Sequence, residues 1–135
     1  LYAGELSNRA RFYISDASFS TFGDELTNIF SQYTKIGSPL ILIFTNIFFR
    51  LRSRFSLFKV SPIRVVEKID QPVLFVHSKP DKFIPYTHTE ELYKKKKPPK
   101  AAWYPERGGH VESYNKNPEK YRRVVESFIA NHVGW

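Results

Sequence analysis

Residues 72–85, with the sequence PVLFVHSKPDKFIP, constrain the fold of this chain more than any other stretch. A proline is followed by five apolar or near-apolar residues and then by a short polar turn that contains Asp81. A continuous apolar run of this length, bounded by turn residues, is typical of a β-strand that is buried on both faces. Such strands occur in the parallel sheets of α/β proteins, which carry their functional groups at the carboxyl ends of the strands. Asp81 is therefore expected at the functional edge of a parallel sheet.

A second apolar run, residues 101–104, leads into a loop that contains Gly108, Gly109 and His110. We expect the two glycines to loosen this loop, so that the imidazole can turn toward a carboxylate on the neighbouring strand. A carboxylate on one ring nitrogen holds a histidine in the tautomer of a general base and stabilises the imidazolium that forms. Taken singly, Asp81 and His110 would be ordinary turn and loop residues. Their order and topology together make them the candidate catalytic acid and histidine.

The rest of the chain alternates between predicted strands and predicted helices. Residues 11–15 form a third apolar run, which ends at Asp16. Helices are predicted over residues 22–33, 40–51, 61–69, 87–97 and 118–133, and residues 1–10 resemble the last turns of another helix. The side chains predicted to cap helices are Ser61, Thr87 together with Glu90, and Asn117. Three strands separated by helices indicate the α/β class with a parallel sheet.

Composition narrows the class of protein. A chain of 135 residues of which 41% are hydrophobic is long and apolar enough for one packed domain. The absence of cysteine excludes disulfides and thiolate metal sites. Because the chain has no methionine and begins with Leu1, we expect its first residue to be an internal one. No signal peptide or membrane-spanning stretch is visible, so a cytoplasmic location is expected, with membrane association through a preceding segment left open.

The net charge of +8 is compatible with nucleic acid or an anionic membrane as a partner. It is also compatible with an ordinary solvated face, because four of the lysines lie together at residues 94–97, where a helix end explains them. Nucleic acid is not expected, because the basic residues are not interleaved with stacking aromatic residues. Residues 22–60 contain a segment that is apolar nearly all round and ends in Arg50, Arg52 and Arg54. This segment has three interpretations: a helical cap or lid over the domain, an ordinary buried helix, or a membrane-surface helix with a basic rim.

A series of motifs occurs in order along the chain: residues 61–63, residues 68–77, Asp81 with Ile84 and Pro85, residues 91–93, Lys100, Gly109 with His110, and residues 113–115. Together they resemble the C-terminal half of bacterial α/β-hydrolases of the serine esterase and prolyl-oligopeptidase-like group. The resemblance extends from the beginning of the chain to about residue 128. The sequence differs from the group at residues 78–80, where the group usually has a glycine and another acid.

This resemblance implies that residues 1–135 are the C-terminal portion of one α/β-hydrolase domain, with residues 22–60 as a helical cap over the acyl pocket. Asp81 matches the triad acid and His110 the triad histidine, whereas Asp16 matches an acid that is usually structural. The implied activity is that of a serine hydrolase, either carboxylesterase-like, lipase-like or a small-peptide hydrolase, which works through an acyl-enzyme. The implied substrate is a small ester or peptide, and the chemistry requires no cofactor.

The nucleophile of this group lies in a Gly-x-Ser-x-Gly turn, which precedes the matched segment. No such motif occurs in the 135 residues, so no nucleophile is assigned, and the N-terminal half of the same hydrolase is the expected partner. The chain alone is therefore expected to be inactive. No metal site is expected, since the four histidines share no ligand spacing. The alternative is a non-catalytic α/β interaction module that binds an anionic membrane surface or a protein partner.

Overall fold

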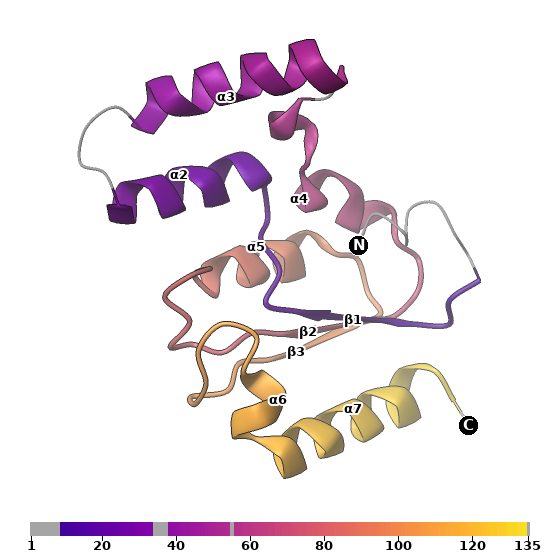
Figure 1. The fold of residues 1–135 in the computed structure, drawn as a ribbon. Coiled ribbons are helices and arrows are strands. Elements are labelled where there is room, and N and C mark those ends of the chain that lie inside the picture. The colour runs from indigo at the N-terminus through magenta and orange to yellow at the C-terminus, as the bar shows by residue number, and fades with distance from the viewer. Residues whose placement is uncertain (1–8, 34–37, 55, 135) are drawn as a thin grey trace.

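The computed structural model describes residues 9–33, 38–54 and 56–134 (Figure 1). Within these ranges one parallel sheet has the order β1–β2–β3, formed by β1 (Tyr13–Asp16), β2 (Val73–Val76) and β3 (Lys100–Trp103). Leu74 in the central strand lies opposite Ile14 on one side and Ala101 on the other. The predicted α/β class with a parallel sheet is confirmed. The helix predicted within residues 1–10 and the break predicted at Gly37 fall on residues outside the described ranges, apart from residues 9 and 10.

Most of the predicted helices are present, within a few residues of their predicted bounds. They are α2 (Phe22–Tyr33), α3 (Ser38–Ser53), α4 (Pro62–Val65) with the 3₁₀ turn η2 (Val66–Lys68), α5 (Thr87–Lys95) and α7 (Pro118–His132). The short helix α6 (Ser113–Lys116) and the 3₁₀ turn η1 (Leu57–Lys59) were not predicted. The single helix predicted over residues 61–69 is divided into α4 and η2. In the described part of the chain, no helix is both long and apolar enough to cross a membrane.

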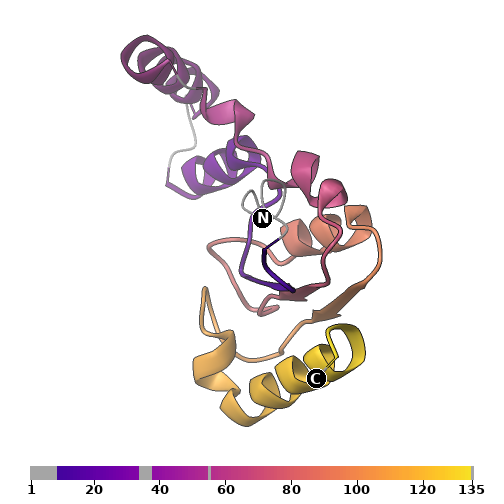
Figure 2. The same ribbon diagram turned by 90° about the vertical axis from the view of Figure 1, so that its right-hand side faces the viewer.

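The central strand β2 is buried along its whole length because helices cover both faces of the sheet (Figures 1 and 2). Val73 and Phe75 face a cluster that includes Leu92 of α5, whereas Leu74 and Val76 face Phe128 of α7. This alternation follows from the two-residue period of a strand. Burial of each of these side chains contributes about 2 kcal/mol to stability. The strand that leads to Asp81 is thus the best-packed element of the sheet.

Helices α2 and α3 form an outer layer on the α5 side of the sheet. In both views α3 lies farthest from the sheet, with α2 between α3 and the rest of the fold (Figures 1 and 2). The two helices confirm the predictions of helix over residues 22–33 and 40–51. Their role as a cap over a substrate stays a prediction.

The three predicted side-chain caps are wrong. Ser61 occupies the N-cap position of α4 but makes no capping hydrogen bond. At α5 the N-cap is Tyr86 and Thr87 is already helical, because the amide of His88 donates to the carbonyl of Pro85 and begins the turn one residue earlier. Asn117 is the N-cap residue of α7, but its side chain bonds to carbonyl groups elsewhere instead of to the helix.

Candidate active site

Asp81 lies in the turn that follows β2, and its carboxylate is held by backbone amides. Its Oδ1 atom accepts hydrogen bonds from the amides of Phe83 at 2.9 Å and Ile84 at 3.0 Å. An aspartate that accepts from amides two and three residues onward stabilises its own turn. The side chain of Asp81 is buried, so both the turn and the acid are fixed. The second oxygen, Oδ2, is left to face two histidines.

The first of these histidines is His77, at the carboxyl end of the central strand and fully buried. Its Nε2 lies 2.9 Å from the carbonyl oxygen of Ile84 and 3.2 Å from Oδ2 of Asp81. A carbonyl oxygen only accepts, so Nε2 carries a proton and Nδ1 accepts from the hydroxyl of Thr89. Burial lowers the pKa of His77, which favours the neutral ring. The single Nε2 proton of the neutral ring therefore faces both the carbonyl of Ile84, which is nearer, and Oδ2 of Asp81, and His77 adds no charge beside the acid.

The second histidine is His110, in the loop between β3 and α6. Its Nδ1 lies 3.0 Å from Oδ2 of Asp81, which is hydrogen-bonding distance. Its ring packs on the ring of Phe83, with the two centroids 4.9 Å apart. The side chain is 33% exposed, and no described residue hydrogen bonds to its Nε2. The structure thus brings together the two predicted residues and leaves Nε2 available for proton transfer.

The loop that carries His110 contains one glycine in a left-handed conformation and several anchoring contacts. Gly108 has a φ of +112°, and a Cβ atom there would lie 2.9 Å from Oγ of Ser78. Val111 has a φ of +58°, which is strained for a β-branched residue. The side chain of Asn117 donates to the carbonyl of Arg107 at 2.9 Å. Gly108 is therefore required by a tight left-handed turn, and the expected loosening of the loop by its two glycines stays a prediction.

Asp16, the acid at the end of β1, has different partners. Its Oδ1 accepts from the hydroxyl of Ser113 at 3.1 Å. Burial raises the pKa of Asp16, partly offset by the hydrogen bonds from Ser113 and Tyr121. Burial, reinforced by Asp16, also raises the pKa of Tyr121 to about 12. Asp16 therefore fastens α6 and α7 to the edge of the sheet, while the acid that contacts His110 is Asp81.

A pocket of about 360 Å³ adjoins His110. It is lined by Ala17, Ser18, Phe19, Pro62, Ile84, His110 and Val111. A second pocket of about 370 Å³ lies between the sheet and α7 and includes neither Asp81 nor His110, so size alone does not identify the site. No group of three or more potential metal ligands occurs among the described residues. The first pocket is the candidate site because it is mostly apolar and presents one imidazole.

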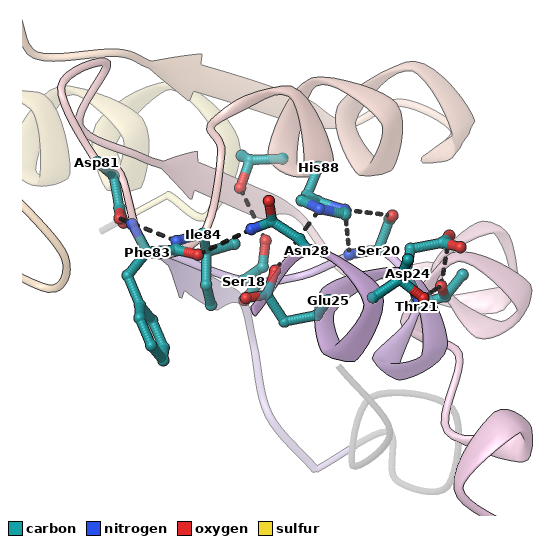
Figure 3. A network of polar contacts seen from close by, with 12 residues as sticks. Ser18, Ser20, Thr21, Asp24, Glu25, Asn28, Asp81, Phe83, Ile84 and His88 are labelled. Atoms are coloured by element: carbon teal, nitrogen blue, oxygen red, sulfur yellow. Dashed lines mark hydrogen bonds and ion pairs between the residues drawn. The ribbon is translucent and has the colours of Figure 1, made fainter. Parts of the chain in front are cut away.

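Polar contacts join α2 to the turn of Asp81 and to α5 (Figure 3). The side-chain amide of Asn28 donates to the carbonyl of Phe83 at 3.1 Å. On the α5 side, Oγ of Ser20 lies 2.7 Å from Nδ1 of His88, and the Nε2 of that ring lies 3.6 Å from Oε2 of Glu25. Ser20 and Glu25 are buried. The position of α2 is therefore linked directly to the turn that holds the candidate acid.

Glu25 provides a test of this buried network. Burial, reinforced by the nearby Asp81, raises the pKa of Glu25 in the folded protein. Because the folded protein holds this proton more tightly than the unfolded chain does, the raised pKa contributes fully to stability below the unfolded-state pKa near 4.5. This contribution is lost as the pH rises through the pKa of Glu25 in the folded state. Glu25→Gln is neutral and of similar shape, so we expect it to increase the free energy of unfolding at neutral pH by about 1 kcal/mol.

Urea denaturation of the full-length protein at neutral pH and below pH 4.5 measures this effect. The gain is expected at neutral pH and should vanish in acid. Glu106→Gln is the matched control, because that side chain is 74% exposed and should change stability little at either pH. A loss of stability in Glu25→Gln at neutral pH would contradict the assignment.

Several solved structures of other proteins have a similar fold. An esterase from Pyrococcus furiosus is 16% identical, with a TM-score of 0.70, over 98% of this chain and 49% of the esterase. An acylaminoacyl peptidase from Pyrococcus horikoshii is 17% identical, with a TM-score of 0.66, over 98% of this chain and 22% of the peptidase. Acetyl xylan esterase 1 from a Thermoanaerobacterium species has a TM-score of 0.61 over 95% of this chain and 40% of the enzyme. The fold is part of an α/β-hydrolase fold.

Sequence comparison adds one relative. The uncharacterized protein YqkD of Bacillus subtilis is 43% identical over 133 residues, which are 97% of this chain. No family model matches the chain. The chain spans about 43% of the length of YqkD and about half of the Pyrococcus furiosus esterase.

Sequence reasoning predicted the contact between Asp81 and His110 but missed His77 and the network of Glu25 and His88. A signal for His77 was present in the sequence. The residue ends a buried strand and precedes Asp81 by four residues, and a buried ring must hydrogen bond its nitrogens, for which the turn of Asp81 is the nearest source of partners. The network around Glu25 depends on the packing of α2 against α5, which no local pattern indicates.

Proposed function

We propose that this chain forms the acid-and-histidine half of a serine hydrolase, in which Asp81 and His110 complete a Ser–His–Asp triad. The supporting observation is the 3.0 Å hydrogen bond between Nδ1 of His110 and Oδ2 of Asp81, beside a mostly apolar pocket. A buried carboxylate on Nδ1 holds the tautomer in which Nε2 accepts a proton. The α/β-hydrolase fold and the order of acid and histidine along the chain are consistent with this role.

In the proposed reaction, Nε2 of His110 removes the proton from a serine hydroxyl while its oxygen attacks the carbonyl carbon of the substrate. Asp81 stabilises the resulting imidazolium through Nδ1. The imidazolium then gives its proton to the leaving group, and an acyl-enzyme remains. Water attacks the acyl-enzyme in the same manner, with His110 again accepting a proton and then returning it to the serine. In each step one proton moves to or from Nε2 of His110, the ring nitrogen to which no described residue hydrogen bonds.

The substrate class follows from the pocket. Ala17, Phe19, Ile84 and Val111 present apolar surface beside His110, so we infer a carboxylic ester or small peptide with an apolar group next to the scissile bond. A volume of about 360 Å³ suits a short group rather than a long acyl chain.

The nucleophile must come from outside these 135 residues, because they contain no Gly-x-Ser-x-Gly turn. Among the described residues, β1 pairs with β2 alone, so its other edge is available to a further strand. We infer that an N-terminal half of the same hydrolase adds that strand, the serine and the amides of the oxyanion hole.

The test compares hydrolysis of short-chain p-nitrophenyl esters by the full-length protein and by the 135-residue chain alone. The proposal expects turnover by the full-length protein only. Hydrolysis by the pure 135-residue chain would contradict it, since that chain would then contain its own nucleophile. No hydrolysis of any ester or peptide substrate by a folded full-length protein would contradict it as well.

A further inference from the structure

Helix α3 carries an apolar stripe on its exposed side. The stripe follows helical spacing, with residues at positions i, i+4, i+7, i+8 and i+11. Its members and their exposed fractions are Leu40 at 61%, Phe44 at 68%, Ile47 at 46%, Phe48 at 64% and Leu51 at 82%. The polar residues Thr45 and Asn46 are half-buried, and Oδ1 of Asn46 accepts from the hydroxyl of Ser56 at 3.1 Å. Leu42 is buried on the inner side of the helix together with these two half-buried polar residues, whereas Ile41, Ile43 and Phe49 are exposed beside the stripe.

A stripe of five large exposed side chains is more than a soluble surface ordinarily carries in one place. It also lies on the helix farthest from the sheet (Figures 1 and 2). Helix α2 separates α3 from the sheet and from the turn of Asp81, so the stripe is not part of the described core. The stripe requires an apolar partner outside the described fold.

The charge around the stripe indicates the chemistry of that partner. From residue 26 to residue 66 the sequence has no Asp or Glu, whereas Lys or Arg occurs at positions 35, 50, 52, 54, 59 and 64. Arg50, Arg52 and Arg54 are exposed at the carboxyl end of α3, and no described acid pairs with them. An apolar helix face with a purely cationic rim is complementary to the acyl region and anionic headgroups of a lipid surface.

We propose that α3 is an interfacial helix, which places its stripe in an anionic lipid surface and its arginines among the headgroups. A second copy of this chain is a poorer partner, because it would bring the same cations and no acid to neutralise them. The inference rests on α3 alone and stands independently of the proposed hydrolase activity.

Sedimentation of the full-length protein with lipid vesicles tests the proposal. We expect binding to phosphatidylglycerol vesicles, much weaker binding to phosphatidylcholine vesicles, and a loss of binding as salt rises. The variant with Phe44→Gln and Phe48→Gln should bind phosphatidylglycerol at least about tenfold more weakly. Because both side chains are exposed, this variant should keep its fold, which circular dichroism checks.

A charge-matched pair of variants separates α3 from the general basic character of the protein. Replacing Arg50, Arg52 and Arg54 by Gln should weaken binding roughly one hundredfold. Replacing Lys120, Arg122 and Arg123 by Gln lowers the net charge by the same three units on exposed positions of α7 and should weaken it far less.

Four outcomes would overturn the proposal. The first is no binding to either vesicle, and the second is an equal loss in the two charge variants, which would indicate unspecific attraction. The third is a dimer of the full-length protein that the Phe44 and Phe48 changes convert to a monomer, which would assign the stripe to a second copy. The fourth is a variant at Phe44 and Phe48 that melts at lower temperature yet binds vesicles unchanged, which would mean that the rest of the protein covers the stripe.

Discussion

His110→Ala is expected to reduce ester hydrolysis by the full-length protein by at least about 10⁴-fold in kcat. Without the imidazole, nothing in the pocket accepts the serine proton, and nothing protonates the leaving group. Substrate binding should change little, because His110 is only one of the seven residues that line the pocket. The residual rate would come from the oxyanion hole and from binding alone.

Steady-state kinetics with a p-nitrophenyl ester measures this effect, and circular dichroism checks the fold of the variant. His132→Ala is the matched control, because His132 is an exposed histidine near the end of α7. That control should retain full activity. A His110→Ala variant that keeps its fold and more than about a tenth of the wild-type kcat would exclude the triad assignment.

Asp81→Asn is expected to lower kcat by about 10⁴-fold with little change in KM. The neutral amide cannot stabilise the imidazolium, and an amide nitrogen facing Nδ1 would favour the tautomer whose Nε2 already carries a proton. The turn itself should persist, since an asparagine oxygen can still accept from the amides of Phe83 and Ile84.

Asp16→Asn is the matched comparison, because it is also an acid at the carboxyl end of a strand in this sheet. Its contacts with Ser113 and Tyr121 are structural, so we expect a change in stability and a kcat within about tenfold of wild type. The same kinetic assay and a thermal melt distinguish the two variants. A larger loss of kcat in Asp16→Asn than in Asp81→Asn would reverse the assignment of the acid.

The sheet and the candidate pair were predictable because both depend on simple constraints. A strand buried on both faces must be apolar throughout, which made β2 recognisable. Parallel strands bring their carboxyl ends to one edge, so an acid after one strand and a histidine after the next were expected to lie close together, and the pairing of β2 with β3 makes them neighbours. The prediction of this contact also used the order of motifs along the chain, since each of the two residues taken singly is ordinary for a turn or a loop.

The features that sequence reasoning missed depend on contacts between distant segments. Asn117 is a residue type that often caps helices, but its side-chain amide donates to the carbonyl of Arg107 instead. This contact depends on the folded loop and is not visible in the sequence. The orientation of α3 was unpredictable for a different reason. A segment that is apolar nearly all round indicates no preferred face, so the inward position of Thr45 and Asn46 appears only in the structure.

The most direct test of the account is labelling with a fluorophosphonate, a probe that reacts with activated serines, followed by peptide mass spectrometry. The account predicts one labelled serine in the full-length protein, outside these 135 residues, and no labelling after His110→Ala. It also predicts that the 135-residue chain alone gains no probe mass. A folded full-length protein that takes up no probe, or a label on a serine within the 135 residues, would contradict the account.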